Sequence, residues 1–508
     1  MNRAAAPLAP AKDDAFDIAA LYREREAERY ALHARFGNEA MVRVLRAIGY
    51  DVGFVAGEGQ YLFDRQGERY LDLLSGWGVF GIGRNRPAVR EALTSVLGAS
   101  LPGLVQMDVS PLAGVLAERL LAHAPYLQKV HFVNSGSEAV EAAIKLARKA
   151  TGRSGIAYCE GAFHGLSSGA LSLNGEAVFR DGFGPLLPAC VAVPFNDLVA
   201  LEAALAAGDV AAFIVEPIQG HSVSVAADGY LAGALTLCRR YGALLVADEI
   251  QTGLGRTGAF FAIDHWGVEP DMLLVSKTLS GGFVPVAAVL ARKAIFDAVY
   301  DRMDRAVVMG STFAGNDLAM AAGLATLEVM EREQVTENAA RLGQRLMAAF
   351  QAMAGRHEMV KSVRGKGLMI GVEFGRPTSL RLQMAWRLLE AANPGLFCQL
   401  ITLPLLKGHR ILAQVAGHGS HTVKLLPSLV ITDADCDWIE RAFDQVIAAS
   451  HRVPGALWDF GRAMAGNALR PRPRARPPSP ISPKAPRSSR TSAGSDPGGS
   501  ARSTAAPS

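Results

Sequence analysis

Two short, largely apolar runs in the middle of the chain each lead into an ionisable side chain. Residues 243–247 are followed by Asp248 and Gln251, and residues 272–276 are followed by Lys277. Runs of this length and character are typical of strands covered on both faces of a sheet. Ligands of open α/β sheets gather at the carboxyl edge, so Asp248 and Lys277 are expected to meet there. A lysine that desolvation keeps neutral can attack a carbonyl carbon.

A third segment offers a site for an anion. Residues 129–134 are predicted to form a strand, and a helix is predicted to begin at Ser135, Gly136 and Ser137. Unpaired N–H groups and hydroxyls at the start of a helix can bind a phosphate. Ser135 with Glu138 three residues later also matches a plain capping box, so this segment alone leaves both interpretations open.

The three features together are more specific than each one separately. A lysine in a loop is usually just exposed, and an aspartate after a strand can simply cap a helix. Pyridoxal phosphate needs a phosphate anchor, a carboxylate at its ring nitrogen and an amine that forms a Schiff base. The sequence has neither a Gly-x-x-x-x-Gly-Lys-Ser/Thr motif nor a Gly-x-Gly-x-x-Gly after a first strand, which argues against a nucleotide. The combination therefore favours pyridoxal phosphate.

The elements that must position these residues follow an α/β pattern. From about residue 111 to 333, strands and helices alternate, which predicts a mainly parallel sheet with helical crossovers. Beyond residue 360 the pattern becomes α+β, with strands near 367–374 and 422–426 and a helix at 432–449. Residues 61–72 read as a β-hairpin, which we assign to this smaller domain.

We expect five regions along the chain. In order, they are a disordered N-terminus (1–13), an N-terminal helix with the first part of a small domain (14–110), a large cofactor-binding domain (111–345), the C-terminal part of the small domain (346–460), and a disordered, basic, Pro/Ser-rich tail (461–508).

Length and composition indicate a globular protein. The 508 residues can bury a large core, and 50% of them are apolar. No window approaches the ~18 to 20 consecutive apolar residues of a membrane span, and the N-terminus lacks the apolar core of a signal peptide, so a cytoplasmic location is expected. The five cysteines show no Cys-x-x-Cys spacing, so neither a disulfide framework nor a metal site is expected.

The positive charge of the chain is concentrated in its tail. From Arg470 onward there are eight basic residues and one acidic residue, a net charge of +7, so the total of +4 leaves −3 for the rest of the chain. A mildly acidic body offers no basic face to a nucleic acid, and the tail has no aromatic residues that would stack on bases. The tail could instead make peripheral contact with an anionic membrane surface.

Several motifs occur in an order that resembles a known family. They are Asn-Ser-Gly-Ser-Glu-Ala (134–139), Phe-His-Gly (163–165), Glu-Pro-Ile-Gln-Gly (216–220), Ala-Asp-Glu-Ile-Gln-Thr-Gly (247–253), Lys277, Gly-Ser-Thr-Phe (310–313) and Arg-Gly-Lys-Gly (364–367). With them, residues 45–450 resemble the class III, ornithine aminotransferase-like enzymes of fold-type I. This implies a large, mainly parallel-sheet, three-layer α/β domain, a smaller α+β domain, and a transaminase that uses pyridoxal phosphate, an amine donor and a carbonyl acceptor.

The resemblance also implies roles for individual residues. Lys277 would form the Schiff base and move the proton, Asp248 would hold the pyridine nitrogen, Gln251 would lie near the ring hydroxyl, Phe163 would stack on the ring, and Gly136 and Ser137 would hold the phosphate. Ser135, His164 and Glu216 are further candidates for the cofactor site, although His164 also fits an ordinary hydrogen-bonded turn histidine. Thr312 would reach the phosphate of a neighbouring protomer, which implies a homodimer with shared active sites.

Three positions depart from the family pattern. Ornithine- and acetylornithine-type members usually carry arginine, glutamate and arginine where this chain has Leu166, His221 and Lys424. In the family these side chains govern how substrate carboxylates are bound, and the point charge of a lysine does not reproduce the planar fork of an arginine. Trp77, His221, Arg364 and Lys424 are our candidates for substrate contacts.

The substrate is left open by the sequence. The apolar segment 395–406 and the following residues 409–421 are most simply small-domain core, but they could line a pocket for an apolar amine or aldehyde. Residues 413–421 and 108–111 resemble the branch assigned to hopanoid side-chain amination, which makes aminobacteriohopanetriol. The alternatives are an ornithine-, acetylornithine- or diamine-type aminotransferase, a same-fold aminomutase, racemase or decarboxylase, and a binding protein without activity.

Overall fold

The computed structural model describes residues 16–451 apart from 106, 393–395 and 418. The predicted disordered N-terminus (1–13) and basic tail (461–508) lie outside the described residues. Residues up to Glu39 belong to a compact unit separate from residues 40–470. The described part of the first unit is helical, with α1 (Ile18–Arg25), η1 (Glu26–Glu28) and α2 (Arg29–Phe36).

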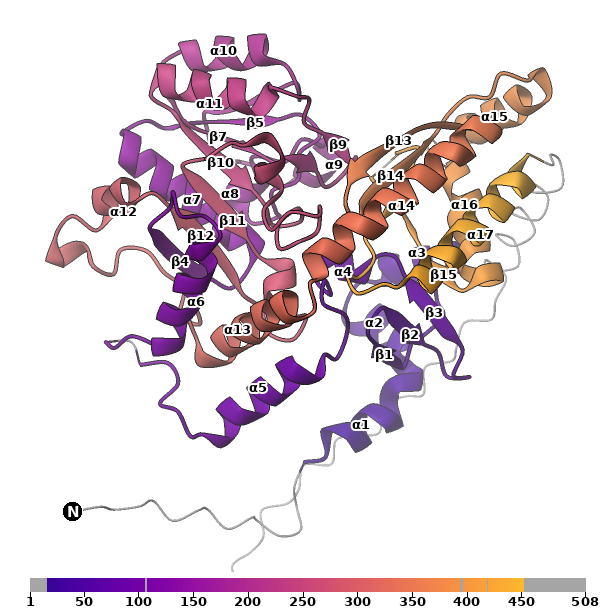
Figure 1. Cartoon of the computed structure of the whole chain (residues 1–508), viewed down its shortest axis with the longest axis horizontal. Coiled ribbons are helices and arrows are strands. Elements are labelled where there is room, and N and C mark those ends of the chain that lie inside the picture. Colours follow the sequence, from indigo (N-terminus) through magenta and orange to yellow (C-terminus); the bar gives the residue numbers. More distant parts are fainter. Residues whose placement is uncertain (1–15, 106, 393–395, 418, 452–508) are drawn as a thin grey trace, which may run out of the picture. The chain divides into compact units, whose positions relative to one another are not determined.

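A seven-stranded sheet forms one part of the second unit, on the left of Figure 1. Its strands, in spatial order, are β4 (Lys129–Val133), β12 (Ala287–Ala291), β11 (Met272–Val275), β10 (Leu244–Asp248), β7 (Val210–Val215), β5 (Gly155–Cys159) and β6 (Cys190–Val193). The pairs from β11 to β6 are parallel, whereas β12 runs antiparallel to both of its neighbours. The predicted mainly parallel sheet is confirmed.

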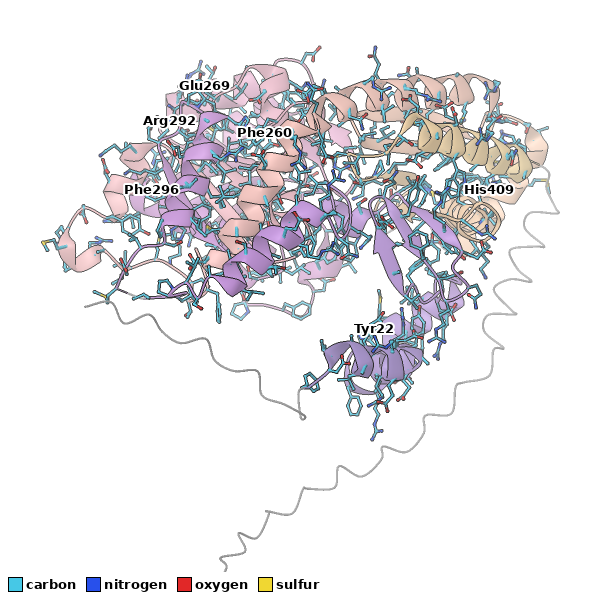
Figure 2. The ribbon with its side chains drawn as sticks, turned by 60° about the horizontal axis from the view of Figure 1, so that its bottom comes forward. Tyr22, Phe260, Glu269, Arg292, Phe296 and His409 are labelled. Carbon is cyan, nitrogen blue, oxygen red and sulfur yellow. The ribbon has the colours of Figure 1, made fainter. Side chains whose placement is uncertain are left out.

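Helices cover both faces of this sheet, which gives the expected three layers. Alternate residues of the strands point to opposite faces, and they belong to two separate core clusters. One cluster contains Val246 and Leu274 of the strands together with the apolar side of α7 (Gly136–Thr151). Helix α12 (Lys293–Val299) belongs to the same cluster, and its Phe296 packs against the cluster (Figure 2). The other joins strand residues such as Val215 and Val275 to α10 (Leu198–Ala206) and α11 (Tyr230–Tyr241).

A second sheet contains the late strands of the chain. It is antiparallel, in the order β13 (Val360–Lys366), β14 (Met369–Phe374), β17 (Thr422–Leu425) and β16 (Gln414–Val415). Helices α14 (Val335–Arg356), α15 (Leu380–Ala392), α16 (Leu396–His409) and α17 (Asp433–Ser450) accompany it. The apolar segment 395–406 lies largely in α16, where Phe397, Ile401 and Leu405 are buried in the main core.

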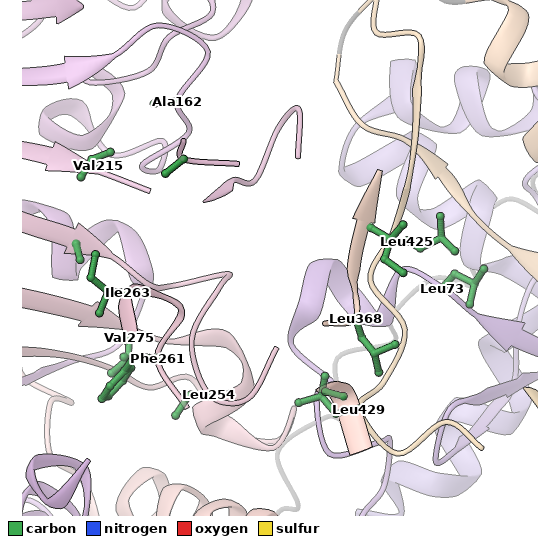
Figure 3. Close-up of a cluster of buried hydrophobic side chains, with 14 of the residues drawn as sticks. Leu73, Ala162, Val215, Leu254, Phe261, Ile263, Val275, Leu368, Leu425 and Leu429 are labelled. Carbon is green, nitrogen blue, oxygen red and sulfur yellow. The ribbon is translucent and has the colours of Figure 1, made fainter. Parts of the chain in front are cut away.

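The early hairpin joins the C-terminal part of the chain. Strands β2 (Tyr61–Phe63) and β3 (Arg69–Asp72) form the predicted hairpin. Strand β1 (Ala56–Glu58) pairs with β2 on its other side, and β15 (Ile411–Leu412) adds to β3 in parallel. The main core continues from this region to the large sheet, with Leu73, Leu368, Leu425 and Leu429 in the same cluster as Phe261 and Val275 (Figure 3). The domain boundaries given above stay a prediction.

The remaining elements connect these layers. They are α3 (Glu39–Ala47), α4 (Ser75–Gly78), α5 (Pro87–Gly98), α6 (Pro111–Ala122), α8 (Ser168–Leu171), α9 (Ala177–Arg180), β8 (Ile218–Gln219), β9 (Ser224–Val225), η2 (Ala262–Trp266), η3 (Lys277–Ser280), η4 (Met303–Arg305) and α13 (Asp317–Arg332). Among the helices that the structure describes, none is long and apolar enough to cross a bilayer.

Candidate active site

Asp248 and Lys277 leave the large sheet at the same edge. Asp248 is the last residue of β10 and lies opposite Leu274 of the parallel strand β11, and Lys277 begins η3 directly after β11. Lys277 has a φ of +43°, which a residue with a Cβ rarely adopts. Burial lowers the pKa of Lys277, and the nearby carboxylates of Asp248 and Glu216 oppose this shift. The juxtaposition predicted from the two strand ends is present.

The Asp248 carboxylate is buried and fixed from two directions. Its Oδ1 accepts a hydrogen bond from the backbone N–H of Ile250 (3.1 Å), and its Oδ2 lies 2.7 Å from Nδ1 of His164. An ionised carboxylate can only accept, so the imidazole donates from Nδ1. Burial lowers the pKa of His164, but the hydrogen bond and the charge of Asp248 outweigh it, and the net shift is upward. His164 thus has a more specific partner than a turn histidine would need.

Glu216 hydrogen-bonds both to the Phe-His-Gly motif (163–165) and within its own motif (216–220). Its carboxylate is buried and accepts hydrogen bonds from the backbone N–H groups of Phe163 (3.1 Å) and Gly220 (2.8 Å). Burial raises the pKa of Glu216, and the charge of His164 opposes this shift. The contacts show that Glu216 holds the Phe163 backbone in place at the edge of the sheet.

The start of α7 provides the expected anion cup, and it is also capped. Oγ of Ser135 accepts a hydrogen bond from the N–H of Glu138 (3.2 Å), as in a capping box. The Glu138 carboxylate, however, accepts from the N–H of Asn134 (2.6 Å), one residue before the N-cap residue Ser135. Gly136 and Ser137 contribute first-turn N–H groups, which have no acceptor within the helix. Both interpretations of this segment therefore apply at once.

The Ser137 hydroxyl connects the cup to the Phe-His-Gly loop. It accepts a hydrogen bond from the N–H of Leu166 (3.2 Å). Gly165 has a φ of +130°, and a Cβ at this position would collide with the Ser137 hydroxyl. Only glycine therefore allows the loop to pass so close to the cup. Leu166 itself is exposed.

The glycine-rich loop after β3 reaches the lysine. A Cβ at Gly78 would lie 3.9 Å from Cδ of Lys277 and 4.0 Å from Cγ of Gln251, so both side chains pass beneath this glycine. Gln251 donates from Nε2 to the backbone carbonyl of Trp77 (3.1 Å). Its Oε1 is buried and has no partner among the described residues, which leaves an acceptor for the hydroxyl of a bound ring. The indole of Trp77 is 60% exposed and donates to Gln414 (2.9 Å).

Lys424 and Arg364, two of the expected substrate-binding residues, are already engaged by the protein. Lys424 is buried and donates to the backbone carbonyl of Gly220 (2.6 Å). Burial, and then the charge of Lys277, lower its pKa to about 7. Arg364 pairs with Glu373 (2.5 Å) and donates to Ser222 O and Thr422 Oγ1 at 2.9 and 3.1 Å. Both side chains are thus held by contacts within the protein.

His221 lies in an aromatic cluster at the same edge. Its ring is parallel to that of Phe163, with an interplanar angle of 8° and centroids 5.6 Å apart, and Phe179 meets both rings edge-on. Nδ1 of His221 lies 2.7 Å from Oε1 of Glu176. No local sequence pattern marks Glu176, Phe179 or Gln414 as residues of a site.

Thr312 lies on an exposed loop beside the cup. The neighbouring Ser311 accepts a hydrogen bond from the side chain of Asn134 (2.7 Å), which follows β4. Thr312 itself is exposed. Its predicted role at the phosphate of a neighbouring protomer stays a prediction.

Comparison with known proteins identifies the family. A family model described as aminotransferase class-III matches residues 49–447. The chain belongs to the class-III aminotransferase family. Members of this family use pyridoxal phosphate, and the residues at the sheet edge fit this cofactor, because they combine a lysine, a fixed carboxylate, a vacant amide acceptor and a helix start within one cluster.

Relatives and solved structures support this assignment. Aminotransferase PigE of Serratia sp. (strain ATCC 39006) is 35% identical over 457 residues, which make up 84% of this chain and 53% of that protein. The chain thus spans about half the length of this curated relative. Ornithine aminotransferase from Toxoplasma gondii ME49 is 30% identical, with a TM-score of 0.74 over 86% of this chain and 99% of that one. A PLP-bound amine transaminase from an uncultivated Pseudomonas species is also 30% identical, with a TM-score of 0.69 over 78% and 94% of the two chains.

Proposed function

We propose that this class-III family member is an aminotransferase that moves an amino group from a small-molecule amine to a carbonyl acceptor. The observation that carries the proposal is the exit of Asp248 and Lys277 from neighbouring strands at one edge of the sheet. Bound there, pyridoxal phosphate would supply a reactive carbonyl and a ring that accepts electrons. The Asp248 carboxylate would keep the ring nitrogen protonated, and the amine of Lys277 would move the proton from the substrate carbon.

The surrounding residues would hold the cofactor. Ser135, Gly136 and Ser137 would bind the phosphate at the start of α7, and the vacant Oε1 of Gln251 would accept from the ring hydroxyl. The Phe163 ring, fixed through its backbone by Glu216, would stack on the cofactor ring. His164 would act through Asp248, because it touches this carboxylate from within the protein.

The proposed reaction is tested by giving the loaded enzyme an amine donor alone. A transaminase keeps the amino group on its cofactor, so the visible absorbance of the cofactor should be lost in proportion to the enzyme, and a 2-oxo acid or aldehyde should restore it. A same-fold aminomutase, racemase or decarboxylase would turn over its substrate without accumulating the aminated cofactor. No loss of absorbance with any amine or amino acid would contradict the proposal.

The substrate is proposed to lack a carboxylate at its reacting carbon. The two cationic candidates are engaged elsewhere, Lys424 with a backbone carbonyl and Arg364 with Glu373. Leu166, which is exposed, stands where ornithine- and acetylornithine-type enzymes usually carry an arginine. Trp77 is a second exposed apolar side chain. These features support a primary amine and an aldehyde as the substrate pair.

One such aldehyde is a hopanoid with a terminal carbonyl, as the resemblance of residues 413–421 and 108–111 implies. The enzyme should then aminate a terminal hopanoid aldehyde faster than it aminates N-acetylornithine semialdehyde. Equal rates, or a preference for the semialdehyde, would favour an ornithine- or acetylornithine-type activity instead.

We also propose that the enzyme is a homodimer whose sites share Thr312. Exposed apolar side chains occur on the segments before α6 and around the Thr312 loop: Leu101, Leu104, Val105, Met107, Val109, Val307, Val308 and Phe313. Gly315 approaches Ala113, and Ser110 donates to Asp317 (2.6 Å), so the two segments are joined where they meet α6 and α13. Sedimentation should give twice the chain mass, and Val109→Asp with Phe313→Asp should give monomers that bind the cofactor weakly.

A further inference from the structure

Four consecutive residues of the glycine-rich loop, 75–78, have positive φ angles. The values are +47° for Ser75, +61° for Gly76, +57° for Trp77 and +93° for Gly78. Glycine adopts this left-handed region readily, but a residue with a Cβ does so at a cost, and two such residues stand in this turn. Backbone strain of this kind persists where the surrounding structure holds it in place, and it is concentrated at functional sites. The contacts of Ser75 and Trp77 therefore indicate what the turn positions.

The turn is fixed at both of its ends. At its start, Oδ1 of the buried Asp72 accepts hydrogen bonds from the N–H of Ser75 (3.0 Å) and from the N–H of the residue before it (2.8 Å). At its end, the carbonyl of Gly78 accepts from Oγ1 of Thr278 (3.0 Å), which directly follows Lys277. The turn is thus attached both to the end of β3 and to the segment that carries the lysine.

The indole of Trp77 anchors the middle of the turn. The residue is 60% exposed, yet its Nε1 donates to Oε1 of Gln414 (2.9 Å) in β16. The backbone next to Gln414 is itself held, because the Tyr50 hydroxyl donates to the carbonyl of Ala413 (2.8 Å). An exposed indole gains little from apolar burial, so this hydrogen bond is the contact that connects Trp77 to the late sheet.

The carbonyl of Trp77 points the other way, toward the cofactor site. It accepts from Nε2 of Gln251 (3.1 Å), and because a carbonyl can only accept, the amide nitrogen must face it. Oε1 of Gln251 is the atom left over, and it is buried without a partner among the described residues. A Cβ at Gly78 would lie 3.9 Å from Cδ of Lys277 and 4.0 Å from Cγ of Gln251, so the turn packs closely on both side chains. The backbone conformation of Trp77 therefore sets the orientation of the Gln251 amide.

We propose that Trp77 is a positioning residue, whose strained backbone, anchored through Gln414, holds the Gln251 amide with its oxygen toward the ring hydroxyl of the bound cofactor. The inference rests on the proposed aminotransferase function and adds to it the group that orients Gln251. The role is independent of the substrate, since Trp77 acts through its carbonyl. When the turn is loosened, the amide rotates and offers an N–H to the ring oxygen, which stabilises the form that has lost its proton and lowers its pKa.

The first test is a pH titration of the visible absorbance of the cofactor in the loaded, full-length enzyme. Trp77→Val and Trp77→Gly both lose the indole, but glycine keeps the positive φ easily, whereas a β-branched residue disfavours it. Trp77→Val should lower the midpoint by about 0.5 pH unit, and Trp77→Gly by less than half of that. In a Gln251→Leu background, Trp77→Val should no longer move the midpoint, because the amide that it releases is absent.

A double-mutant cycle tests the anchor. Trp77→Phe keeps an aromatic ring but removes the donor, and Gln414→Leu removes the acceptor. Each should lower the midpoint in the same direction as Trp77→Val. The double variant should shift it no further than either single variant, because both remove one hydrogen bond. These milder substitutions keep the inference testable if Trp77→Val does not fold.

Hydrogen exchange of the cofactor-free protein gives a readout that needs neither cofactor nor turnover. The N–H of Phe80 donates to the carbonyl of Ser75 (3.0 Å), and this bond depends on the turn. Its exchange should be at least about tenfold faster in Trp77→Val and in Gln414→Leu. Gln334→Val is the matched control, since Gln334 is exposed and has a φ of +49°, and it should change neither this exchange nor the midpoint.

Four outcomes would overturn the inference while the proposed function stands. They are an unmoved midpoint in Trp77→Val, equal shifts in Trp77→Val and Trp77→Gly, a shift that persists in the Gln251→Leu background, and additive shifts in the double-mutant cycle. If the unaltered enzyme binds no cofactor and shows no visible absorbance, the proposed function fails first, and that result differs from each of the four.

Discussion

The imidazole of His164 lies 2.7 Å from the carboxylate of Asp248, and both side chains are buried at the edge of the large sheet. His164 lies in the loop after β5 and Asp248 is the last residue of β10, and the two strands are separated in the sheet by β7. The pair fixes the orientation of the group that is proposed to hold the ring nitrogen. His164 is therefore a positioning residue, whose effect should appear through the cofactor rather than through substrate binding.

Replacing His164 by asparagine should slow the half-reaction with an amine donor about 30-fold, because a charge-assisted hydrogen bond contributes about 2 kcal/mol. The substrate concentration for half-saturation should change little. The check is stopped-flow bleaching together with a pH titration of the cofactor absorbance, whose midpoint should move in His164→Asn. An unmoved midpoint would assign His164 a purely structural role.

Asp248→Asn should have a larger effect than His164→Asn, since it removes the charge that keeps the ring nitrogen protonated. The expected loss in turnover is about 10²- to 10³-fold, with the cofactor still bound through Lys277. Asp181→Asn provides the control, because Asp181 is an exposed acid far from the strand end in sequence. Turnover within a few-fold of the unaltered enzyme would refute the proposed role of Asp248.

Gly165→Ala should weaken cofactor binding. Gly165 has a φ of +130°, and its added Cβ would collide with the Ser137 hydroxyl, so the loop must move away from the phosphate cup. The dissociation constant of the cofactor, measured by equilibrium dialysis, should rise at least tenfold. Gly98→Ala, at a position where a Cβ meets nothing within 4 Å, should leave it unchanged.

Lys424→Met should change how stability depends on pH. The pKa of Lys424 is lowered to about 7 in the folded protein, whereas in the unfolded chain it is about 10.4. Between these values the unfolded state binds more protons, so the free energy of unfolding rises with pH, by up to about 1.4 kcal/mol per unit. Lys424→Met removes this contribution.

Urea titrations of the cofactor-free protein at pH 7, 8 and 9 test this prediction. The slope of unfolding free energy against pH should be lower in Lys424→Met than in the control Lys145→Met, which alters an exposed lysine of α7. The variant also leaves the Gly220 carbonyl without its donor, which costs about 1–2 kcal/mol at every pH and leaves the slope unaffected. Identical slopes would show that Lys424 keeps an ordinary pKa.

The sequence predicted the part of the site that depends on local pattern. Apolar runs located β10 and β11, and parallel pairing then brought Asp248 and Lys277 to one edge. The helix start at residues 135–137 was equally visible, because capping and helical periodicity are local. The cofactor and the family followed from these residues and their order.

The hydrogen bonds of the candidate substrate-binding residues could not be predicted in the same way. Lys424 reaches a carbonyl 204 positions away, Arg364 a carbonyl 142 positions away, and His221 a carboxylate 45 positions away. Such contacts depend on how the late sheet packs beside the large one, which no short motif records. The contacts of His164 and Glu176 escape a reading of the sequence for the same reason, because their partners lie on distant segments of the chain.

The proposed attachment of the cofactor to Lys277 can be measured directly. The loaded enzyme is reduced with borohydride, digested, and its peptides are examined by mass spectrometry. The reduced cofactor should be found on the peptide that contains Lys277, at about one per chain, and it should be absent from Lys277→Ala. Attachment to the peptide that contains Lys424, or no attachment to any lysine, would contradict the proposed role of Lys277.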